Sequence, residues 1–318
     1  MTQTLCNCLN PDIAPLALAL HSSDEQAGFA ISQCELCKLA WTSPSPSDEQ
    51  LKQAYSSEYY SSTEAKFNPL IEWWTRFSGI RRARRLLRCH GEQTGPLRVL
   101  DVGCGRGVLL DGFRQLGHQV LGLEREGSGF EQLPDIETSS LPELIQKGEK
   151  YDIIVLWHVL EHLPQPLKTL QECYQLLADH GSLFIEVPNY GSLQSRLFAD
   201  RWFHLDVPRH LYHFTVRSLT AVVEAARLKL RGTSTFSLDQ NLYGFLQSLS
   251  NTLPGIPHNH LYSLLQSKLS ARTLLLLLLY SPLVALGSVL AILESLLSSF
   301  TGTGAVLSVH LKKFDDDQ

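Results

Sequence analysis

The sequence predicts an α/β fold built on a mostly parallel β-sheet. An apolar run at 97–102 leads into a turn that has glycine at every second position. Further apolar runs at 119–123, 151–156 and 182–189 alternate with segments of helical periodicity. Strands that alternate with helices form parallel sheets with right-handed crossovers. Ligands of such sheets bind beyond the carboxyl ends of the strands, so we expect the functional residues at that edge.

The glycine turn is the predicted ligand site. Gly103, Gly105 and Gly107 can take positive φ without penalty and let a ligand approach the backbone. The helix that follows directs its free N–H groups into the turn. Val108 stands where the dinucleotide-binding turn G-x-G-x-x-G requires its last glycine. Asp101 precedes the turn, where a carboxylate would repel a pyrophosphate and attract the α-amino group of an amino-acid ligand.

Acidic and histidine side chains follow two more of the predicted strands. Glu124 ends the run at 119–123 and is a natural acceptor for two ribose hydroxyls. His158, Glu161 and His162 follow the run at 151–156 and would share one face if that segment turns helical. The sequence therefore places these side chains at one edge of the sheet.

In this order the motifs resemble those of class I S-adenosylmethionine-dependent methyltransferases, in a branch similar to the ubiquinone-biosynthesis O-methyltransferases. They are D-V-G-C-G-R-G at 101–107, Glu124, Y-D-I-I-V-L-W-H-V-L-E-H-L at 151–163 and G-S-L-F-I-E-V-P-N at 181–189. The resemblance covers about 95–240. It implies a Rossmann-like, mostly parallel seven-stranded sheet with helices on both faces, S-adenosylmethionine as cofactor and methyl transfer as activity. The cofactor-binding residues expected on this basis are Asp101, Gly103, Cys104, Gly105, Gly107, Glu124, Leu141 and Trp157.

The candidate catalytic residues are His162, His210, Glu161 and His158. A histidine general base, with a pKa suited to taking a hydroxyl proton near neutral pH, is the first interpretation of His162. A structural hydrogen bond is the second. In the quinone-type relatives the matching positions bind a divalent metal. Because His158 replaces the usual carboxylate, the third interpretation is a zinc, iron or manganese site rather than magnesium.

The segment 201–214 predicts an acceptor-binding loop, because it is dense in histidine, arginine and aromatic residues. Its substrate-binding candidates are His204, Asp206, Arg209 and His213, with Arg209 suited to a carboxylate or phosphate. At least two of its histidines are expected to be structural. Tyr59 and Tyr60 could line the same pocket from a helical cap, although packing against the main domain explains them equally well.

Two cysteine pairs near the start of the chain predict a zinc knuckle. Cys6 and Cys8 lie about 25 residues before Cys34 and Cys37, and four thiolates close a tetrahedral structural zinc site. The alternative is four reduced, unligated cysteines. The first pair is C-x-C rather than the usual C-x-x-C, which tightens the knuckle.

Composition limits the partners. The 318-residue chain carries a net charge of −5, which argues against nucleic acid. Seven cysteines without a signal-peptide pattern indicate a reducing, cytoplasmic location. The protein would be peripheral on a membrane if its apolar segment at 239–304 contacts one. The basic cluster Arg81, Arg82, Arg84, Arg85 and Arg88 is expected to be a solvated helix face.

The expected organisation has five parts. They are the cysteine-rich segment 1–43, a helical cap at 44–94, the cofactor-binding domain at 95–238, an apolar helical insertion at 239–304, and the last strand with an acidic tail at 305–318.

The apolar insertion contains a segment of membrane-spanning length. Residues 274–297 are long enough to cross a bilayer, which takes about 20 apolar residues. A single crossing would separate the strand at 305–311 from its sheet. We therefore expect a helical hairpin broken near Pro282 or an interfacial helix, and a lid or a homodimer contact through 258–300 is the soluble alternative.

The expected function is methyl transfer to an oxygen of a small-molecule or lipid-like acceptor, with a histidine base. Two other classes remain open at this stage. One is a non-catalytic, membrane-associated scaffold that retains the fold. The other is a nicotinamide-dependent oxidoreductase, against which Val108 and Asp101 count.

Overall fold

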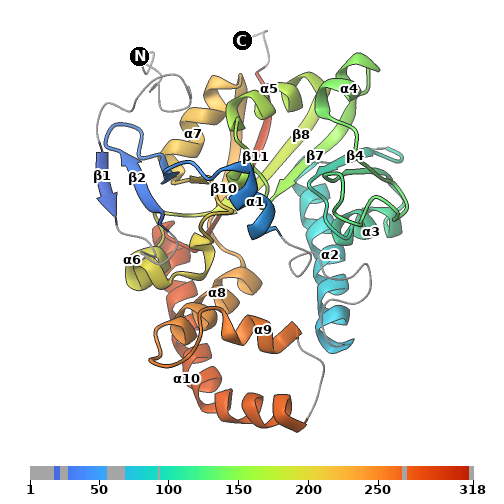
Figure 1. Cartoon of the computed structure of the whole chain (residues 1–318). Helices are drawn as coiled ribbons and strands as arrows, with labels where there is room; N and C mark the ends of the chain where they lie inside the picture. The colour runs from blue at the N-terminus through green and yellow to red at the C-terminus, as the bar shows by residue number, and fades with distance from the viewer. Residues whose placement is uncertain (1–17, 22–27, 56–68, 92–93, 267–270, 315–318) are drawn as a thin grey trace.

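A seven-stranded sheet forms the centre of the computed structural model, which describes residues 18–21, 28–55, 69–91, 94–266 and 271–314 (Figure 1). The strand order is β10-β11-β8-β7-β4-β5-β6. The strands are β4 (Arg98–Val102), β5 (Gln119–Leu123), β6 (Ile136–Glu137), β7 (Tyr151–Trp157), β8 (Leu177–Pro188), β10 (Leu228–Ser234) and β11 (Val306–Lys313). Strands β6, β5, β4, β7 and β8 are parallel, and β11 runs antiparallel to β8 and β10. The predicted seven-stranded, mostly parallel sheet is confirmed.

Helices cover both faces of this sheet. On one face, α2 (Pro69–His90) and α3 (Val108–Gln115) pack through Ala83, Leu86 and Phe113 against Ile153 and Val155 of β7. On the other face, α4 (Leu141–Gln146), α5 (Pro166–Leu176) and α7 (Val216–Ala225) contribute Leu144, Leu170 and Leu219 to the larger core cluster. Residues 153–156 of β7 are fully buried, which explains why this strand is a continuous apolar run rather than an alternating one.

The N-terminal segment forms a second, antiparallel sheet in the order β1-β2-β3-β9. Its strands are β1 (Leu18–His21), β2 (Ala30–Cys34), β3 (Ala40–Ser43) and β9 (Tyr212–His213). Strand β9 belongs to the segment that was predicted to bind the acceptor. The N-terminal sheet is therefore completed by a strand that lies far from it in the sequence. A short helix, α1 (Asp48–Ala54), follows β3 behind a capping box at Ser47.

The turn between β2 and β3 carries one of the two predicted cysteine pairs. Cys34 is fully buried, Cys37 is half-buried, and the turn closes with a Lys38 N–H bond to the Cys34 carbonyl at 3.0 Å. Cys6 and Cys8 lie outside the described residues. The four-thiolate zinc site therefore stays a prediction.

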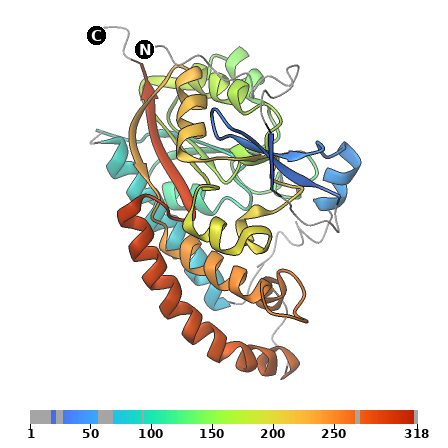
Figure 2. The same cartoon turned by 90° about the vertical axis from the view of Figure 1, so that its left-hand side faces the viewer.

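Three helices form the insertion between β10 and β11: α8 (Leu238–Asn251), α9 (His260–Gln266) and α10 (Ala271–Thr301). The expectation of a hairpin broken at Pro282 is wrong, because α10 continues through this proline as one helix. Within it, Leu278–Thr301 is long and apolar enough to cross a membrane, with a mean hydropathy of 1.9 and 28% of that window buried. Figure 2 shows α10 along the outer edge of the molecule, below the sheet.

Candidate active site

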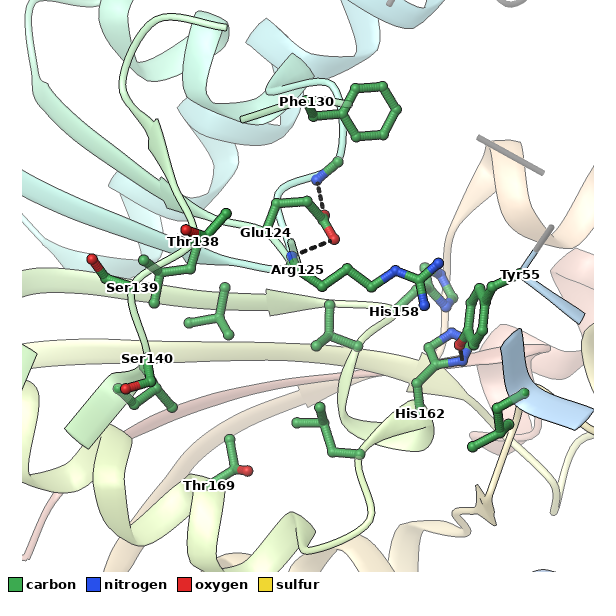
Figure 3. A pocket seen from close by; sticks show the side chains of 18 of the residues that line it. Tyr55, Glu124, Arg125, Phe130, Thr138, Ser139, Ser140, His158, His162 and Thr169 are labelled. Carbon is green, nitrogen blue, oxygen red and sulfur yellow. Dashed lines mark hydrogen bonds between the residues drawn. The ribbon is translucent and has the colours of Figure 1, made fainter. Parts of the chain in front are cut away.

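A pocket of about 860 Å³ lies at the carboxyl edge of the sheet, where β4, β5 and β7 end (Figure 3). Its volume is in the range of sites that enclose a cofactor-sized ligand. The glycine turn and Glu124 form one part of its wall, His158 and His162 another, and α1 a third. The structure therefore joins the predicted cofactor motif and two of the predicted catalytic histidines in one cavity.

The glycine turn has the backbone geometry that its sequence predicted. Gly103, Gly105 and Gly107 have φ values of 70°, 53° and 72°, in the left-handed region that favours glycine. A Cβ on Gly103 would stand 2.5 Å from Val159 Cγ2, so this position also needs glycine for space. Gly103 and Gly105 line the pocket, and Gly107 caps the start of α3.

Glu124 points at the glycine turn. Its Oε2 accepts a hydrogen bond from the Gly105 N–H at 2.9 Å, and its Oε1 accepts one from the Arg125 N–H at 3.0 Å (Figure 3). The carboxylate is thereby fixed at the end of β5 on the pocket wall. A carboxylate at this place can accept from both hydroxyls of a ribose.

Asp101 lies at the end of β4 and is 3% exposed. Burial raises the pKa of this carboxyl to about 7, while the nearby Arg82 lowers it and Glu124 raises it further. The side chain is thus poised between its charged and neutral forms near neutral pH. A cationic ligand group beside it would favour the charged form.

The other predicted cofactor residues divide between this pocket and the structure around it. Leu141, at the start of α4, lines the pocket beside Ser139 and Ser140. Cys104 instead packs against β5, where a Cβ on Gly122 would meet its Sγ at 2.5 Å, and burial raises the pKa of its thiol. Trp157 does not line this pocket. Its ring lies 3.9 Å from the Arg82 guanidinium and lines a different cavity, on the α2 side of the sheet, so its contact with the cofactor stays a prediction.

His162 reaches the pocket from the 3₁₀ turn at Leu160–His162, directly after β7. Its Nδ1 lies 2.9 Å from the Tyr55 hydroxyl, as Figure 3 shows, and 3.0 Å from the Arg209 carbonyl oxygen. A carbonyl oxygen can only accept, so Nδ1 carries the proton in the neutral ring and Nε2 keeps its lone pair. This is the tautomer that a general base needs.

His158 lies between two buried carboxylates. Its Nδ1 is 3.3 Å from Glu161 Oε1, and its Nε2 is 3.4 Å from Glu186 Oε1. Burial lowers the pKa of His158, but the two carboxylates more than offset this and raise it to about 9. His158 is therefore a fixed cation at the pocket wall near neutral pH, which makes it a poor proton acceptor.

His210 is buried beneath His162, with ring centroids 4.6 Å apart. Its Nδ1 donates to the His204 carbonyl at 3.0 Å, and burial lowers its pKa well below the ordinary value. It does not line the pocket. From this position His210 does not reach an acceptor in the pocket, so its predicted role as the base is not supported. The position suits a residue that packs against His162 and holds its ring in place.

The predicted acceptor-binding residues of the segment 201–214 also lie behind the pocket wall. His204 and His213 are buried, and burial lowers the pKa of each to about 3. Asp206 and Arg209 form an ion pair with each other. None of these four side chains lines the main pocket, and their role in acceptor binding stays a prediction. The segment's density of polar groups is explained by mutual hydrogen bonds and by β9.

The structure regroups the candidate metal ligands. Ligand atoms of Glu161, His162 and His210 lie within 4.8 Å of one another, whereas His158 is engaged by the two carboxylates. Two imidazoles and a carboxylate suit zinc, iron or manganese. The predicted set His158, Glu161 and His162 is therefore replaced by one in which His210 takes the place of His158.

Among the pocket residues that the sequence analysis missed, Tyr55, Phe130 and Arg125 contribute aromatic or charged groups. Tyr55 closes the end of α1, bonds His162 and lies 4.1 Å below the Arg125 guanidinium. Phe130 lines the opposite wall. The tyrosine-rich stretch that begins at Tyr55 was a usable signal, but the sequence interpretation favoured Tyr59 and Tyr60, which lie outside the described residues. Arg125 directly follows Glu124 and carried no signal of its own.

Comparison with known proteins agrees with this architecture. Residues 73–231, half of the chain, match the family described as "Methyltransferase domain". The chain belongs to this methyltransferase family. A ubiquinone biosynthesis O-methyltransferase of Acinetobacter baylyi is 32% identical over 155 residues, and one of Aliivibrio fischeri is 32% identical over 113 residues.

These matches are partial. The first covers 42% of this chain and 65% of the relative, and the second covers 32% and 48%. The chain thus spans less than two thirds of the length of these methyltransferases. Among solved structures, a SAM-dependent methyltransferase from Archaeoglobus fulgidus is 21% identical, with a TM-score of 0.47, covering 75% of this chain and 94% of that one.

Proposed function

We propose that the chain transfers the methyl group of S-adenosylmethionine to a hydroxyl oxygen of a small-molecule or lipid-like acceptor. The observation that carries this is the single pocket in which the glycine turn and Glu124 face His162. Membership of the methyltransferase family and the partial similarity to ubiquinone biosynthesis O-methyltransferases support it. The two other classes, scaffold and oxidoreductase, have no comparable site observation in their favour.

The residues of the turn suit this cofactor. Glu124 would exchange its bond with the Gly105 N–H for the ribose hydroxyls, and the charged form of Asp101 would attract the cationic amino-acid end. Leu141 and Phe130 offer apolar surface for the adenine. S-adenosylmethionine supplies a methyl group on a good leaving group, so the protein mainly positions the acceptor and manages its proton.

His162 is the proposed base. Its Nε2 takes the acceptor's proton as the acceptor oxygen forms its bond to the methyl carbon, and the methyl–sulfur bond breaks to leave the thioether. Tyr55 and the Arg209 carbonyl hold Nδ1 and thus fix the ring. The proton that His162 takes up would pass to solvent after the transfer.

Calorimetric titration with S-adenosylhomocysteine tests the cofactor site. We expect Glu124→Ala to weaken binding by about tenfold to a hundredfold, because two hydrogen bonds to a charged acceptor are lost. Glu126→Ala is the matched control, since Glu126 is exposed two positions further along the chain and does not line the pocket. The proposal fails if the folded chain binds neither the cofactor nor its product.

A panel of phenolic and hydroxylated lipid acceptors tests the base. We expect His162→Gln to lower kcat by about a hundredfold or more while cofactor affinity stays within a factor of two. His180→Gln, at an exposed histidine of β8, should leave both unchanged. Equal loss of activity and of cofactor binding in His162→Gln would remove the base assignment.

Chelation separates the base from a metal site. Under the metal alternative, Glu161, His162 and His210 would hold a divalent ion that orients the acceptor oxygen. Activity that survives chelator treatment, with no metal in the active protein beyond the one equivalent expected for the knuckle cysteines, supports the base. Restoration of chelator-sensitive activity by zinc, iron or manganese would support the metal instead.

The zinc knuckle is a separate proposal about the N-terminal sheet. The β2–β3 turn already holds Cys34 and Cys37 three residues apart, as a knuckle requires. We expect one equivalent of zinc in the purified protein, measured by elemental analysis, and its loss in Cys34→Ser. Metal-free protein of full stability would contradict this.

A further inference from the structure

The outward face of α10 is apolar along nearly its whole length. Among the residues of α10 whose burial is described, eleven large apolar side chains are exposed, and Phe300 is 89% exposed. They are Leu275, Leu278, Leu279, Leu286, Val289, Leu290, Ile292, Leu293, Leu296, Leu297 and Phe300. An apolar surface of this extent on a water-soluble protein marks a site that contacts another molecule or a membrane.

The polarity of α10 is the reverse of that of a helix on the surface of a soluble protein. Glu294, Ser295 and Ser298 are buried against the body of the protein, while Leu293, Leu296 and Leu297 on the same turns are exposed. Glu294 Oε2 accepts a hydrogen bond from Gln194 Nε2 at 2.9 Å. Helices in contact with lipid show this arrangement, with polar groups facing the protein and apolar groups facing outward.

Both halves of α10 are held by hydrogen bonds to the rest of the protein. The Tyr280 hydroxyl lies 2.8 Å from His260 Nδ1 of α9, and the Thr303 carbonyl beyond the helix accepts from the Leu193 N–H at 2.9 Å. Strand β11 then enters the sheet between β8 and β10. A helix of 31 residues is about 46 Å long along its path, and Figure 1 shows α10 bending between its two halves. Because both ends return to one side, it can lie along a membrane surface but cannot cross.

Helix α2 carries a cluster of positive charge in its second half. Its arginines surround a cavity of about 360 Å³ between α2 and the start of α8, and Arg82 is paired with Asp239 there at 3.4 Å. Within the described ranges, Arg81, Arg85 and Arg88 have no carboxylate within 4 Å. The sequence interpretation of this cluster as a solvated helix face is therefore incomplete, because four guanidinium groups line one cavity.

Aromatic side chains accompany these arginines. Trp73, Trp74 and Phe77 are exposed on the first turns of α2, and the Arg81 guanidinium lies 5.9 Å from the Trp74 ring. Figure 1 shows that α2, α8, α9 and α10 all extend below the carboxyl edge of the sheet. Tryptophan and arginine are typical of the interface between lipid headgroups and the apolar interior.

We propose that this end of the molecule rests on an anionic lipid bilayer. The apolar face of α10 lies in one leaflet, parallel to the surface, and the arginine-lined cavity takes a lipid phosphate. Charge complementarity favours lipid over a second copy of the chain, since an isologous contact would bring the two arginine clusters toward each other. The proposal does not depend on methyl transfer, so the two can fail separately.

Vesicle co-sedimentation without cofactor tests the proposal on the full chain. We expect binding to vesicles of phosphatidylcholine with one third phosphatidylglycerol. Leu293→Ser with Leu297→Ser should weaken the partition coefficient about tenfold, because both changes remove apolar surface from the leaflet. Leu197→Ser is the matched control, since Leu197 is exposed on α6 (Leu193–Phe198) and should have no effect.

The arginines have their own arm of the test. Arg85→Gln with Arg88→Gln should remove at least a fivefold preference for anionic over neutral vesicles, with Arg217→Gln as an exposed control on α7. Equal binding of the leucine variant and the wild type would overturn the proposal. So would a chain that ignores vesicles and forms a dimer in sedimentation analysis that Leu293→Ser with Leu297→Ser dissociates.

Discussion

At the scale of single residues, Asp101 links stability to cofactor binding. Its carboxyl has a pKa of about 7 in the folded chain, above the ordinary value of 3.8. A raised folded-state pKa stabilises the fold fully below about pH 4, and this contribution is lost as pH rises through 7. The free protein therefore carries a destabilising buried charge at alkaline pH.

We expect Asp101→Asn to stabilise the free chain relative to wild type at pH 8 more than at pH 5, by about 2.5 kcal/mol between the two. The same change should weaken cofactor binding, because the ammonium group loses its counter-charge. Denaturant unfolding at both pH values, with calorimetric titration of S-adenosylhomocysteine, measures the two effects. A stability difference that does not change with pH would contradict the assignment.

Sequence reasoning was effective for residues whose role depends on neighbours in the chain. Gly103 and Gly105 were assigned to the pocket wall from the turn that they form, and Glu124 from the end of its strand. It was less effective for the histidines of the segment 201–214. Their type and density suggested a ligand site, but burial beneath His162 and pairing across β9 depend on contacts far apart in sequence.

At the scale of elements, the glycine turn depends on the 3₁₀ turn that faces it. A methyl group on Gly103 would meet Val159 at 2.5 Å and would also strain a residue with a φ of 70°. We expect Gly103→Ala to lower cofactor affinity at least tenfold and stability by about 1–2 kcal/mol.

A control variant separates the effect of backbone strain from the effect of the clash with Val159. Gly117 has a φ of 86°, and a Cβ there would meet nothing within 4 Å. Gly117→Ala should thus cost similar stability and leave cofactor affinity unchanged, as measured by thermal unfolding and calorimetric titration. Full affinity in Gly103→Ala would show that Val159 moves aside.

In the insertion, the sequence pattern did not distinguish a helical hairpin from one continuous helix. Its apolar composition was plain, and a strand after it was predicted correctly at β11. Pro282 suggested a break, yet α10 continues through it, because the packing of its inner face on α8 and α9 fixes the helix on both sides. The distribution of Glu294 and the leucines around the helix carried the stronger signal.

At the scale of the whole molecule, the N-terminal sheet and the main sheet form one unit through the segment 201–214. The Thr42 hydroxyl of β3 donates to the His210 carbonyl at 2.6 Å, and β3 pairs with β9. The support of His162 therefore includes a residue about 120 positions away in the chain.

We expect Thr42→Val to lower the free energy of unfolding by about 1–3 kcal/mol, because a buried carbonyl loses its donor. Scanning calorimetry should still show one transition. Thr252→Val is the control, since its hydroxyl also bonds a backbone carbonyl but at an exposed site. Separate melting of the N-terminal sheet in either protein would show that the two sheets are not one cooperative unit.

The place of β11 in the sheet imposes an order on synthesis. β10 has β11 as its partner in the sheet, and β11 leaves the ribosome only after the whole of α10. The apolar helix α10 is thus exposed to solvent while one side of the sheet is still open. During that interval the apolar side chains of α10 can aggregate with other chains. A nearby membrane or a chaperone would shield this helix, whose outer face stays exposed even in the folded protein.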